Sequence, residues 1–397
     1  MKKRDLFFKL KKHLDKKQIS LVIGARQTGK TTLLHQLQKY INSELHLPNY
    51  FLSLEDPLIL DTLDQHPDKL LQVLPPLDLN RRTIIFIDEI QYLKNPSNFL
   101  KYHYDKYQSS IKFVVSGSSS FYIDEKFKDS MAGRKRIFKL LTLSMEEFLL
   151  FKNREELIPL INAGELPTIY VNELNTLLDQ YMVYGGYPDV VVETDVEEKK
   201  EILREIANSY VKKDAIESGL KNLDAYLTVL KIIAQRIGGQ FNSNEIAGNF
   251  GFSHLTIKSY LGLMKKSFHV TTICPFFTNL SKELKKMPKA YFNDLGLRNF
   301  FINNFQPLVL RVNKGGIFEN FVFRRFLDKY DTDDIKYWRS QKKQEVDFII
   351  QNNKAFEAKF SETKFSLKKY QFFIEKYPKI PLKLISYDNV LKIKLDE

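Results

Sequence analysis

An eight-residue segment near the start of the chain has the residue types and spacing of a phosphate-binding loop. It reads Gly24-Ala25-Arg26-Gln27-Thr28-Gly29-Lys30-Thr31 and fits the pattern GxxxxGK[ST] at every position. The glycines allow backbone N–H groups to surround phosphate oxygens, and the helix expected after the loop adds the partial positive charge of its N-terminus. We expect Lys30 to reach the β- and γ-phosphates and the Thr31 hydroxyl to bind Mg²⁺. The predicted nucleotide-binding residues are Gly24, Arg26, Gln27, Thr28, Gly29, Lys30, Thr31 and Thr32.

Two acidic residues follow an apolar run that lies further along the chain. The run Thr83-Ile84-Ile85-Phe86-Ile87 is typical of a strand buried on both faces of a parallel sheet, and Asp88 and Glu89 come directly after it. The carboxyl end of such a strand lies at the edge where open α/β sheets bind ligands. We therefore expect Asp88 to hold Mg²⁺, directly or through water, and Glu89 to orient and polarise the attacking water. A solvated acidic strand end is the alternative interpretation.

Strands and helices alternate around these motifs from residue 18 to about residue 145. Apolar runs predict strands at residues 19–23, 50–54, 84–87, 112–116 and 136–140, with helices between them. This alternation predicts an α/β fold with a parallel sheet that helices cover on both faces.

Two further polar residues are candidates for the same site. Ser116 closes the fourth strand, where its side chain would sit between the acids and the γ-phosphate as a sensor, although a plain serine-rich turn is the alternative. Arg134 follows a polar loop and is a candidate arginine finger, acting within the chain or across a subunit interface of a homo-oligomer. A solvated loop arginine is an equally good interpretation of Arg134.

Residues 222–294 have the element pattern of a winged helix. The pattern consists of a helical stripe, a short helix from Ser243, a third helix capped by Ser253, and strands over residues 269–276 and 289–293. The third helix would enter a major groove of DNA. A winged helix that packs against protein is the alternative.

The region from residue 315 to residue 397 predicts a helix, three strands, a second helix and a final strand. Asp347 and Glu357 are acids among apolar neighbours in two of these strands. Glu357 and Lys359 are two residues apart and so face the same side of the sheet, where Asp347 can meet them. Two carboxylates and a carbonyl suit Mg²⁺, which would activate water at a phosphodiester. Lys359 would position that water or neutralise the transition state, and Glu319 would complete the site from the helix.

The overall composition indicates which partners and which cellular compartment to expect. The net charge of +13 and the pI of about 9.3 favour an anionic partner, nucleic acid first, and a generally basic, lysine-rich proteome is the alternative. The stretch 256–289 supports this with seven lysines and one acid, Glu283. A single cysteine excludes an internal disulfide and fits the cytoplasm, and no apolar stretch approaches the roughly 20 residues that span a membrane. Residues 1–17 predict a basic amphipathic helix that docks onto the core.

Taken together, the chain resembles the prokaryotic AAA-type ATPases that carry a C-terminal domain of unknown function related to PD-(D/E)xK nucleases. The resemblance covers essentially all 397 residues and rests on GARQTGKTTLL, IIFIDEI, VVSGSSS, MAGRKRIFKLLTLSMEEF, YGGYPDVV, YFNDLGL, GIFENFV and WRSQKKQEVDFII followed by FEAKF. It implies binding of ATP and Mg²⁺, with Lys30, Thr31, Asp88 and Glu89 at the positions of the family's nucleotide motifs. A degenerate nuclease fold that only binds or assembles is the alternative for the C-terminal domain.

The expected architecture is an α/β P-loop NTPase with an AAA-like parallel sheet, followed by a helical lid, a winged helix and a C-terminal α/β nuclease-like domain. The expected bounds are an N-terminal helix at 1–17, the ATPase core at 18–145, the helical lid or linker at 146–220, the winged helix at 221–305 and the nuclease-like domain at 310–397.

Three functions are consistent with the sequence. The first is a Mg²⁺-dependent ATPase that couples its nucleotide state to a DNA-binding, nuclease-like tail. The second is a metal-dependent DNA nuclease regulated by ATP. The third is a nucleotide-switched scaffold with an inactive nuclease fold.

Overall fold

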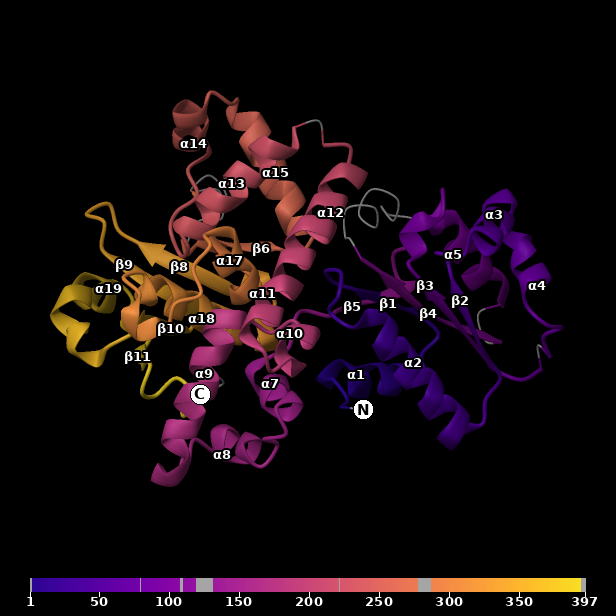
Figure 1. Cartoon of the computed structure of the whole chain (residues 1–397), viewed down its shortest axis with the longest axis horizontal. Coiled ribbons are helices and arrows are strands. Elements are labelled where there is room, and N and C mark those ends of the chain that lie inside the picture. The colour runs from indigo at the N-terminus through magenta and orange to yellow at the C-terminus, as the bar shows by residue number, and fades with distance from the viewer. Residues whose placement is uncertain are drawn as a thin grey trace. The chain divides into compact units, whose positions relative to one another are not determined.

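The chain forms two compact units in the computed structural model, which describes residues 2–78, 80–107, 110–118, 131–220, 222–277 and 287–393 (Figure 1). Unit 1 comprises Met1–Leu141 and Lys266–Phe268, and unit 2 comprises Thr142–Lys265 and His269–Glu397.

Unit 1 is built on a parallel sheet whose strand order is β2-β3-β4-β1-β5. The strands are β1 (Ile19–Ile23), β2 (Asn49–Ser53), β3 (Thr83–Asp88), β4 (Ile111–Gly117) and β5 (Lys135–Lys139). Every residue of β1, β3 and β4 is buried, because these central strands are covered on both faces. The predicted α/β fold with a parallel sheet is confirmed.

Alternate residues of the central strands pack on opposite faces of this sheet. One face contacts α1 (Asp5–His13) and α2 (Lys30–Tyr40), and the other contacts α3 (Pro57–Gln65), α4 (Leu70–Val73) and α5 (Pro96–Tyr107). The apolar stripe of α1 is buried against the sheet, which confirms that the N-terminal helix docks onto this core.

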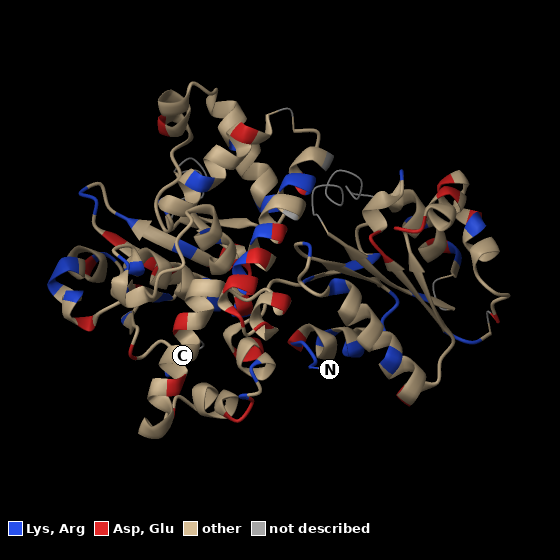
Figure 2. Ribbon diagram, viewed as in Figure 1, with Lys and Arg blue, Asp and Glu red and all other residues tan. Residues whose placement is uncertain are grey.

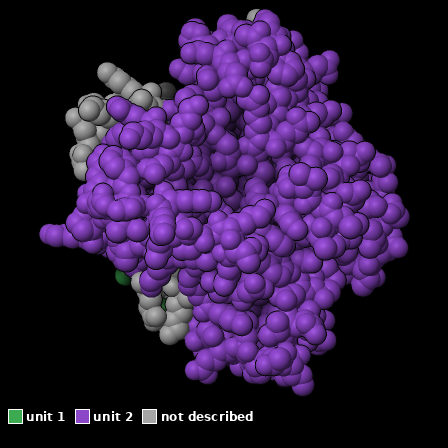
Figure 3. Space-filling view, turned by 90° about the vertical axis from the view of Figure 1, so that its left-hand side faces the viewer, with its two compact units in different colours: residues 1–141, 266–268 green, residues 142–265, 269–397 purple. Residues whose placement is uncertain are grey.

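Unit 2 begins with a run of helices. They are α7 (Met145–Phe151), α8 (Leu157–Ala163), α9 (Thr168–Tyr184), α10 (Pro188–Val192), α11 (Val196–Glu205) and α12 (Lys212–Glu217). Ser144 and Glu147 start α7 with a reciprocal capping box, in which each side chain accepts a hydrogen bond of 3.1 Å from the other residue's backbone N–H. In the space-filling view, the described residues of unit 2 form one continuous body (Figure 3).

A mixed sheet follows in unit 2, with the strand order β11-β10-β9-β8-β6-β7. Its strands are β6 (Val270–Pro275), β7 (Lys289–Phe292), β8 (Ile335–Arg339), β9 (Glu345–Ile350), β10 (Lys354–Lys359) and β11 (Leu382–Ser386). The pairs β6/β8 and β10/β11 are parallel, whereas β6/β7, β8/β9 and β9/β10 are antiparallel.

The elements predicted for a winged helix are present, but their two strands do not form a free wing. The helices are α13 (Leu223–Gln235), α14 (Ser243–Phe250) and α15 (His254–Lys266). Strand β6 continues into the C-terminal sheet because Cys274 and Pro275 pair with Lys336 and Tyr337 of β8. The local pattern identified the strands correctly and missed this partner, which comes much later in the chain.

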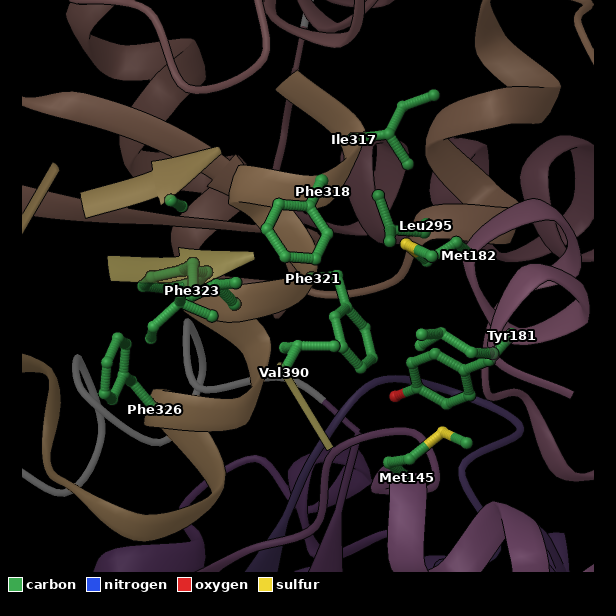
Figure 4. Close-up of a cluster of buried hydrophobic side chains, with 14 of the residues drawn as sticks. Met145, Tyr181, Met182, Leu295, Ile317, Phe318, Phe321, Phe323, Phe326 and Val390 are labelled. Atoms are coloured by element: carbon green, nitrogen blue, oxygen red, sulfur yellow. The ribbon is translucent and has the colours of Figure 1, made fainter. Parts of the chain in front are cut away.

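Helix α18 (Lys314–Lys329) lies at the centre of the apolar core of unit 2. Phe318, Phe321 and Phe326 of this helix point into a cluster that also receives Met145 of α7 and Tyr181 of α9 (Figure 4). The rings of Tyr181 and Phe321 pack edge to face with their centroids 5.7 Å apart. This core joins the early helices of unit 2 to the sheet. Two further α-helices of the described residues are α17 (Leu295–Phe301) and α19 (Gln371–Lys376).

The turn at residues 184–188, which contains the sequence YGGYP, packs against the start of α17. The carboxylate of Asp294 accepts hydrogen bonds from the backbone N–H groups of Gly186 (2.8 Å) and Leu297 (2.9 Å). A Cβ on Gly296 would lie 2.0 Å from the carbonyl oxygen of Tyr184. The YGGYP and YFNDLGL motifs therefore form one packing junction, and the turn is pinned at this junction.

Candidate functional site

The predicted phosphate-binding loop connects β1 to α2, and its two glycines are required for different reasons. A Cβ on Gly24 would lie 2.0 Å from the carbonyl oxygen of Leu140, so there is no room for a side chain. Gly29 has a φ of 90°, a left-handed conformation that favours glycine, and it caps the start of α2. Gln27 also has a positive φ, of 60°. The loop thus has the tight backbone that phosphate binding requires.

Side chains brace this loop from inside. Lys30 is buried, and its Nζ donates to the carbonyl oxygens of Gly24 (3.1 Å) and Ala25 (2.9 Å). The Thr28 hydroxyl also donates to Ala25, at 2.9 Å. Arg26 is buried in the loop, whereas Thr31 and Thr32 are exposed on the first turn of α2.

Arg4 also stabilises the phosphate-binding loop, and the sequence analysis did not predict this role. Its guanidinium donates to the carbonyl oxygens of Thr28 and Leu141, each at 3.0 Å. It thereby ties the residue before α1 to the phosphate-binding loop. A basic residue among many in an N-terminal segment gives no sequence signal for such a contact.

The residues expected to hold Mg²⁺ meet at the carboxyl ends of β3 and β4. The Thr31 hydroxyl donates to Asp88 Oδ2 at 2.6 Å, and the Ser116 hydroxyl donates to Asp88 Oδ1. The backbone N–H of Glu89 donates to the Ser116 oxygen at 3.1 Å. Hydroxyl and carboxylate oxygens are ligands that Mg²⁺ prefers, so Thr31 and Asp88 fit the expected ion.

Glu89 has an unusual conformation and an additional partner. Its backbone is left-handed, with φ 58° and ψ 49°, which is uncommon for a residue other than glycine. Its carboxylate accepts a hydrogen bond from the Gln91 amide, which also donates to the Ser118 hydroxyl at 2.9 Å. Gln91 and Ser118 were not predicted as site residues. Ser119 and Ser120 of the same serine-rich segment lie outside the described residues.

Arg134 pairs with Asp105 on α5. Its Nε lies 2.8 Å from Asp105 Oδ1, and a terminal nitrogen lies 3.3 Å from Oδ2. The arginine-finger role of Arg134 stays a prediction.

In unit 2 the four predicted C-terminal residues lie in one cluster. Lys359 of β10 lies 3.5 Å from Asp347 Oδ2 of β9 and also forms an ion pair with Glu357. The backbone N–H of Asp347 donates to the Glu357 carboxylate at 3.2 Å, which links β9 to β10. Glu319 approaches from α18 and accepts a hydrogen bond of 2.7 Å from Tyr291.

Lys289 of β7 lies at the centre of this cluster, which the sequence did not predict. Its Nζ lies 2.6 Å from Glu345, 2.9 Å from Glu319 and 3.3 Å from Asp347. Lys289 was counted among the lysines expected to contact phosphates, but its side chain is only 1% exposed. The prediction that Lys289 contacts phosphates is wrong, because its side chain lies on the edge strand β7 and points inward to three carboxylates.

Burial and charge set the protonation of the cluster. Burial raises the pKa values of Glu319 and Glu357 to about 7, and the nearby Asp347 carboxylate adds to both shifts. Burial also opposes ionisation of Asp347, yet the ammonium groups of Lys289 and Lys359 hold its pKa below the ordinary value. Burial disfavours the charged form of Lys289, but Glu319, Tyr291, Asp347 and Glu345 outweigh it and raise its pKa.

Family models match the chain in three segments. A model described as an AAA domain matches residues 16–149. Two models described as domains of unknown function, DUF8612 and DUF4143, match residues 175–308 and 314–397. Together with the parallel sheet and the loop between β1 and α2, the first match supports a P-loop, AAA ATPase-like fold for the N-terminal part of the chain.

Whole-chain relatives are uncharacterised. The chain is 26% identical over 394 residues to an uncharacterised protein of Methanocaldococcus jannaschii, covering 94% of this chain and 82% of that protein. It is 26% identical over 387 residues to an uncharacterised protein of Haemophilus influenzae, covering 95% and 86% respectively. The solved structure of the Aeropyrum pernix ORC2 protein in ADPNP–ADP complexes is similar with a TM-score of 0.38 and 14% identity, covering 67% of this chain and 84% of that one.

No described helix is both long enough and apolar enough to cross a membrane.

Proposed function

We propose that this chain is a Mg²⁺-dependent ATPase that converts ATP to ADP and phosphate, with its nucleotide state coupled to unit 2. The observation that carries the proposal is the 2.6 Å hydrogen bond from the Thr31 hydroxyl to Asp88, next to the loop that holds Lys30. Thr31 and Asp88 would hold Mg²⁺. The bound ion would neutralise charge that develops on the phosphate oxygens.

Two side chains exchange partners when ATP enters, and a third keeps its contact. Lys30 leaves the carbonyl oxygens of its own loop for phosphate oxygens, because an ionised acceptor binds an ammonium more strongly than a neutral carbonyl does. Glu89 leaves Gln91 and accepts a proton from the attacking water. Ser116, which donates to Asp88, keeps the ends of β3 and β4 in register and senses the γ-phosphate.

Turnover of ATP with and without Mg²⁺ tests this proposal. Lys30→Ala removes the phosphate-binding ammonium, and Glu89→Gln removes the base while keeping the shape of the side chain. We expect each change to lower turnover by about 10²-fold or more, with ATP binding retained only in Glu89→Gln. Lys39→Ala is a matched control, because Lys39 is an exposed lysine in the last turn of α2. Wild-type turnover no higher than that of Lys30→Ala would overturn the proposal.

We further propose that α15 contacts nucleic acid and that this contact depends on the nucleotide state of unit 1. This helix buries Ile257 and Met264, while His254, Lys258 and Lys265 are exposed. Acidic and basic residues are interspersed along the ribbon in Figure 2, and we assign the proposed contact to this helix alone. Three more lysines and one acid of the same stretch, Lys282, Lys285, Lys286 and Glu283, lie outside the described residues.

Binding of a DNA duplex across a range of salt concentrations tests the role of α15. If Lys258 and Lys265 each contact a phosphate, their joint replacement by alanine reduces the slope of log affinity against log salt by about 2. Lys231→Ala on α13 serves as a control for removal of an exposed positive charge. Binding that is insensitive to salt would count against nucleic acid as the partner.

A second candidate function is a nucleotide-switched scaffold whose C-terminal cluster does not cleave DNA. The ion pairs of Lys289 with three carboxylates favour this scaffold over an ATP-regulated nuclease. Slow ATP turnover that DNA does not stimulate would support the scaffold. Both candidate functions are compatible with a homo-oligomer in which Arg134 acts between two copies of the chain, and we propose this arrangement for either.

A further inference from the structure

The carboxylates that a metal-dependent nuclease site requires already surround a positive charge. Glu319 comes from α18, and Glu345 and Asp347 come from the same face of β9. All three place an oxygen within 3.3 Å of the Lys289 Nζ. These separations are those of charge-assisted hydrogen bonds to an ammonium.

Backbone pairing and neighbouring residues hold Lys289 in position. Its backbone pairs with Ile273 of β6 on one side and bridges to Gln240 on the other. Its neighbour Tyr291, on the same face of β7, donates to Glu319. The main chain closes the site behind this carboxylate, because a Cβ on Gly238 would lie 2.9 Å from both Glu319 oxygens.

A divalent ion does not fit beside this ammonium. Mg²⁺ requires near-octahedral oxygen ligands at roughly 2.0–2.1 Å and keeps several waters, which demands the space that the Lys289 Nζ fills. Among the described residues, no group of three His, Cys, Asp or Glu side chains is arranged to hold a metal ion. The metal site predicted from Asp347, Glu357 and Glu319 therefore does not fit the residues that surround it.

We propose that Lys289 is the resident cation of the C-terminal cluster and takes the place of a divalent metal. The cluster then holds α18, β7 and β9 together through ion pairs, and Lys359 serves Asp347 and Glu357 as a second internal counter-ion. No water is activated there by a metal. The proposal depends only on unit 2, so it can fail without affecting the ATPase proposal.

Binding of Mn²⁺ to the nucleotide-free full chain tests this proposal by electron paramagnetic resonance. The Asp88→Asn background weakens the metal position of the ATP site, so that any tightly bound ion belongs elsewhere. In this background we expect no tightly bound Mn²⁺. Adding Lys289→Met removes the internal cation while keeping an unbranched chain, and we expect one Mn²⁺ per chain to be gained.

A third variant and a cleavage assay complete the test. Adding Asp347→Asn to Lys289→Met removes a carboxylate oxygen, and we expect the gained Mn²⁺ to be lost again. One tightly bound Mn²⁺ in Asp88→Asn alone would overturn the proposal, as would a folded Lys289→Met variant that gains none. If Lys289→Met does not fold, the Asp88→Asn measurement decides alone. Plasmid cleavage in Mn²⁺ by the wild type that Asp347→Asn abolishes would also overturn it.

Discussion

If Glu89 is the general base, as we propose, its hydrogen bond with Gln91 is the contact that bound ATP would break. The left-handed backbone of Glu89 carries its carboxylate to the Gln91 amide, and Gln91 in turn binds the Ser118 hydroxyl at the end of β4. A base that is hydrogen-bonded to its own chain is not available to water. Under this proposal, the Gln91 amide competes with the attacking water for the Glu89 carboxylate.

Replacing Gln91 by alanine is expected to raise basal turnover. Loss of one hydrogen bond of about 1 kcal/mol that must break before the reaction corresponds to a rise in kcat of about fivefold. Affinity for ATP should be unchanged, because Gln91 does not belong to the phosphate-binding loop. Steady-state kinetics measures both, with Gln91→Asn as the conservative control. A fall in kcat would show that Gln91 positions Glu89 for the reaction.

Lys112 makes the stability of unit 1 depend on pH. Burial, together with the nearby Arg82 charge, lowers the pKa of Lys112 from its ordinary value of 10.5 to about 7. The Asp15 carboxylate opposes this shift. The Lys112 Nζ contacts His13 Nδ1 at 3.2 Å and the Gln18 carbonyl. Between pH 7 and 10.5 the unfolded chain binds more protons than the folded one.

The free energy of unfolding is therefore expected to rise with pH over that window, by at most about 1.4 kcal/mol per pH unit from this group. Below pH 7 the contribution of this group is constant. Urea unfolding at a series of pH values measures the rise, and Lys112→Met should remove it. The same pH slope in wild type and variant would show that other groups are responsible.

At the scale of elements, the sequence predicts the strands themselves but not the pairing between strands that are far apart in the chain. The strands of unit 1 and the segment at residues 335–386 were predicted because apolar runs and alternation are local signals. The attachment of β6 to β8 and the position of Lys289 were not predicted, because both depend on pairing between segments far apart in sequence. The positions of the phosphate-binding loop, Asp88 and Ser116 could be predicted from the order of the motifs. The contacts of Arg4 and Gln91 could be recognised only in the structure.

The junction between the YGGYP turn and α17 is expected to be a weak point for mutation. Asp294→Ala removes the cap of α17 and leaves the buried N–H of Gly186 without its acceptor. We expect a loss of about 2–4 kcal/mol in the free energy of unfolding of unit 2. Asp189→Ala, at an exposed aspartate in α10, is the control and should change stability by less than about 0.5 kcal/mol. Equal effects of the two changes would refute the role of the junction.

At the scale of the whole molecule, each unit has its own apolar core, so we expect two thermal unfolding transitions. If ATP with Mg²⁺ binds residues of unit 1, as we propose, it should raise the transition of that unit most. At about 100 times Kd the stabilisation is about 2.7 kcal/mol. Differential scanning calorimetry measures both transitions, and Lys30→Ala should abolish the shift. A shift of the unit 2 transition alone would place the ligand site elsewhere.

Equilibrium binding of ATP to the purified chain tests the central claim most directly. With Mg²⁺ present, we predict saturable binding by the wild type, loss of binding in Lys30→Ala, and weaker dependence on Mg²⁺ in Asp88→Asn. Absence of ATP binding by the wild type at millimolar ATP and Mg²⁺ would contradict the account.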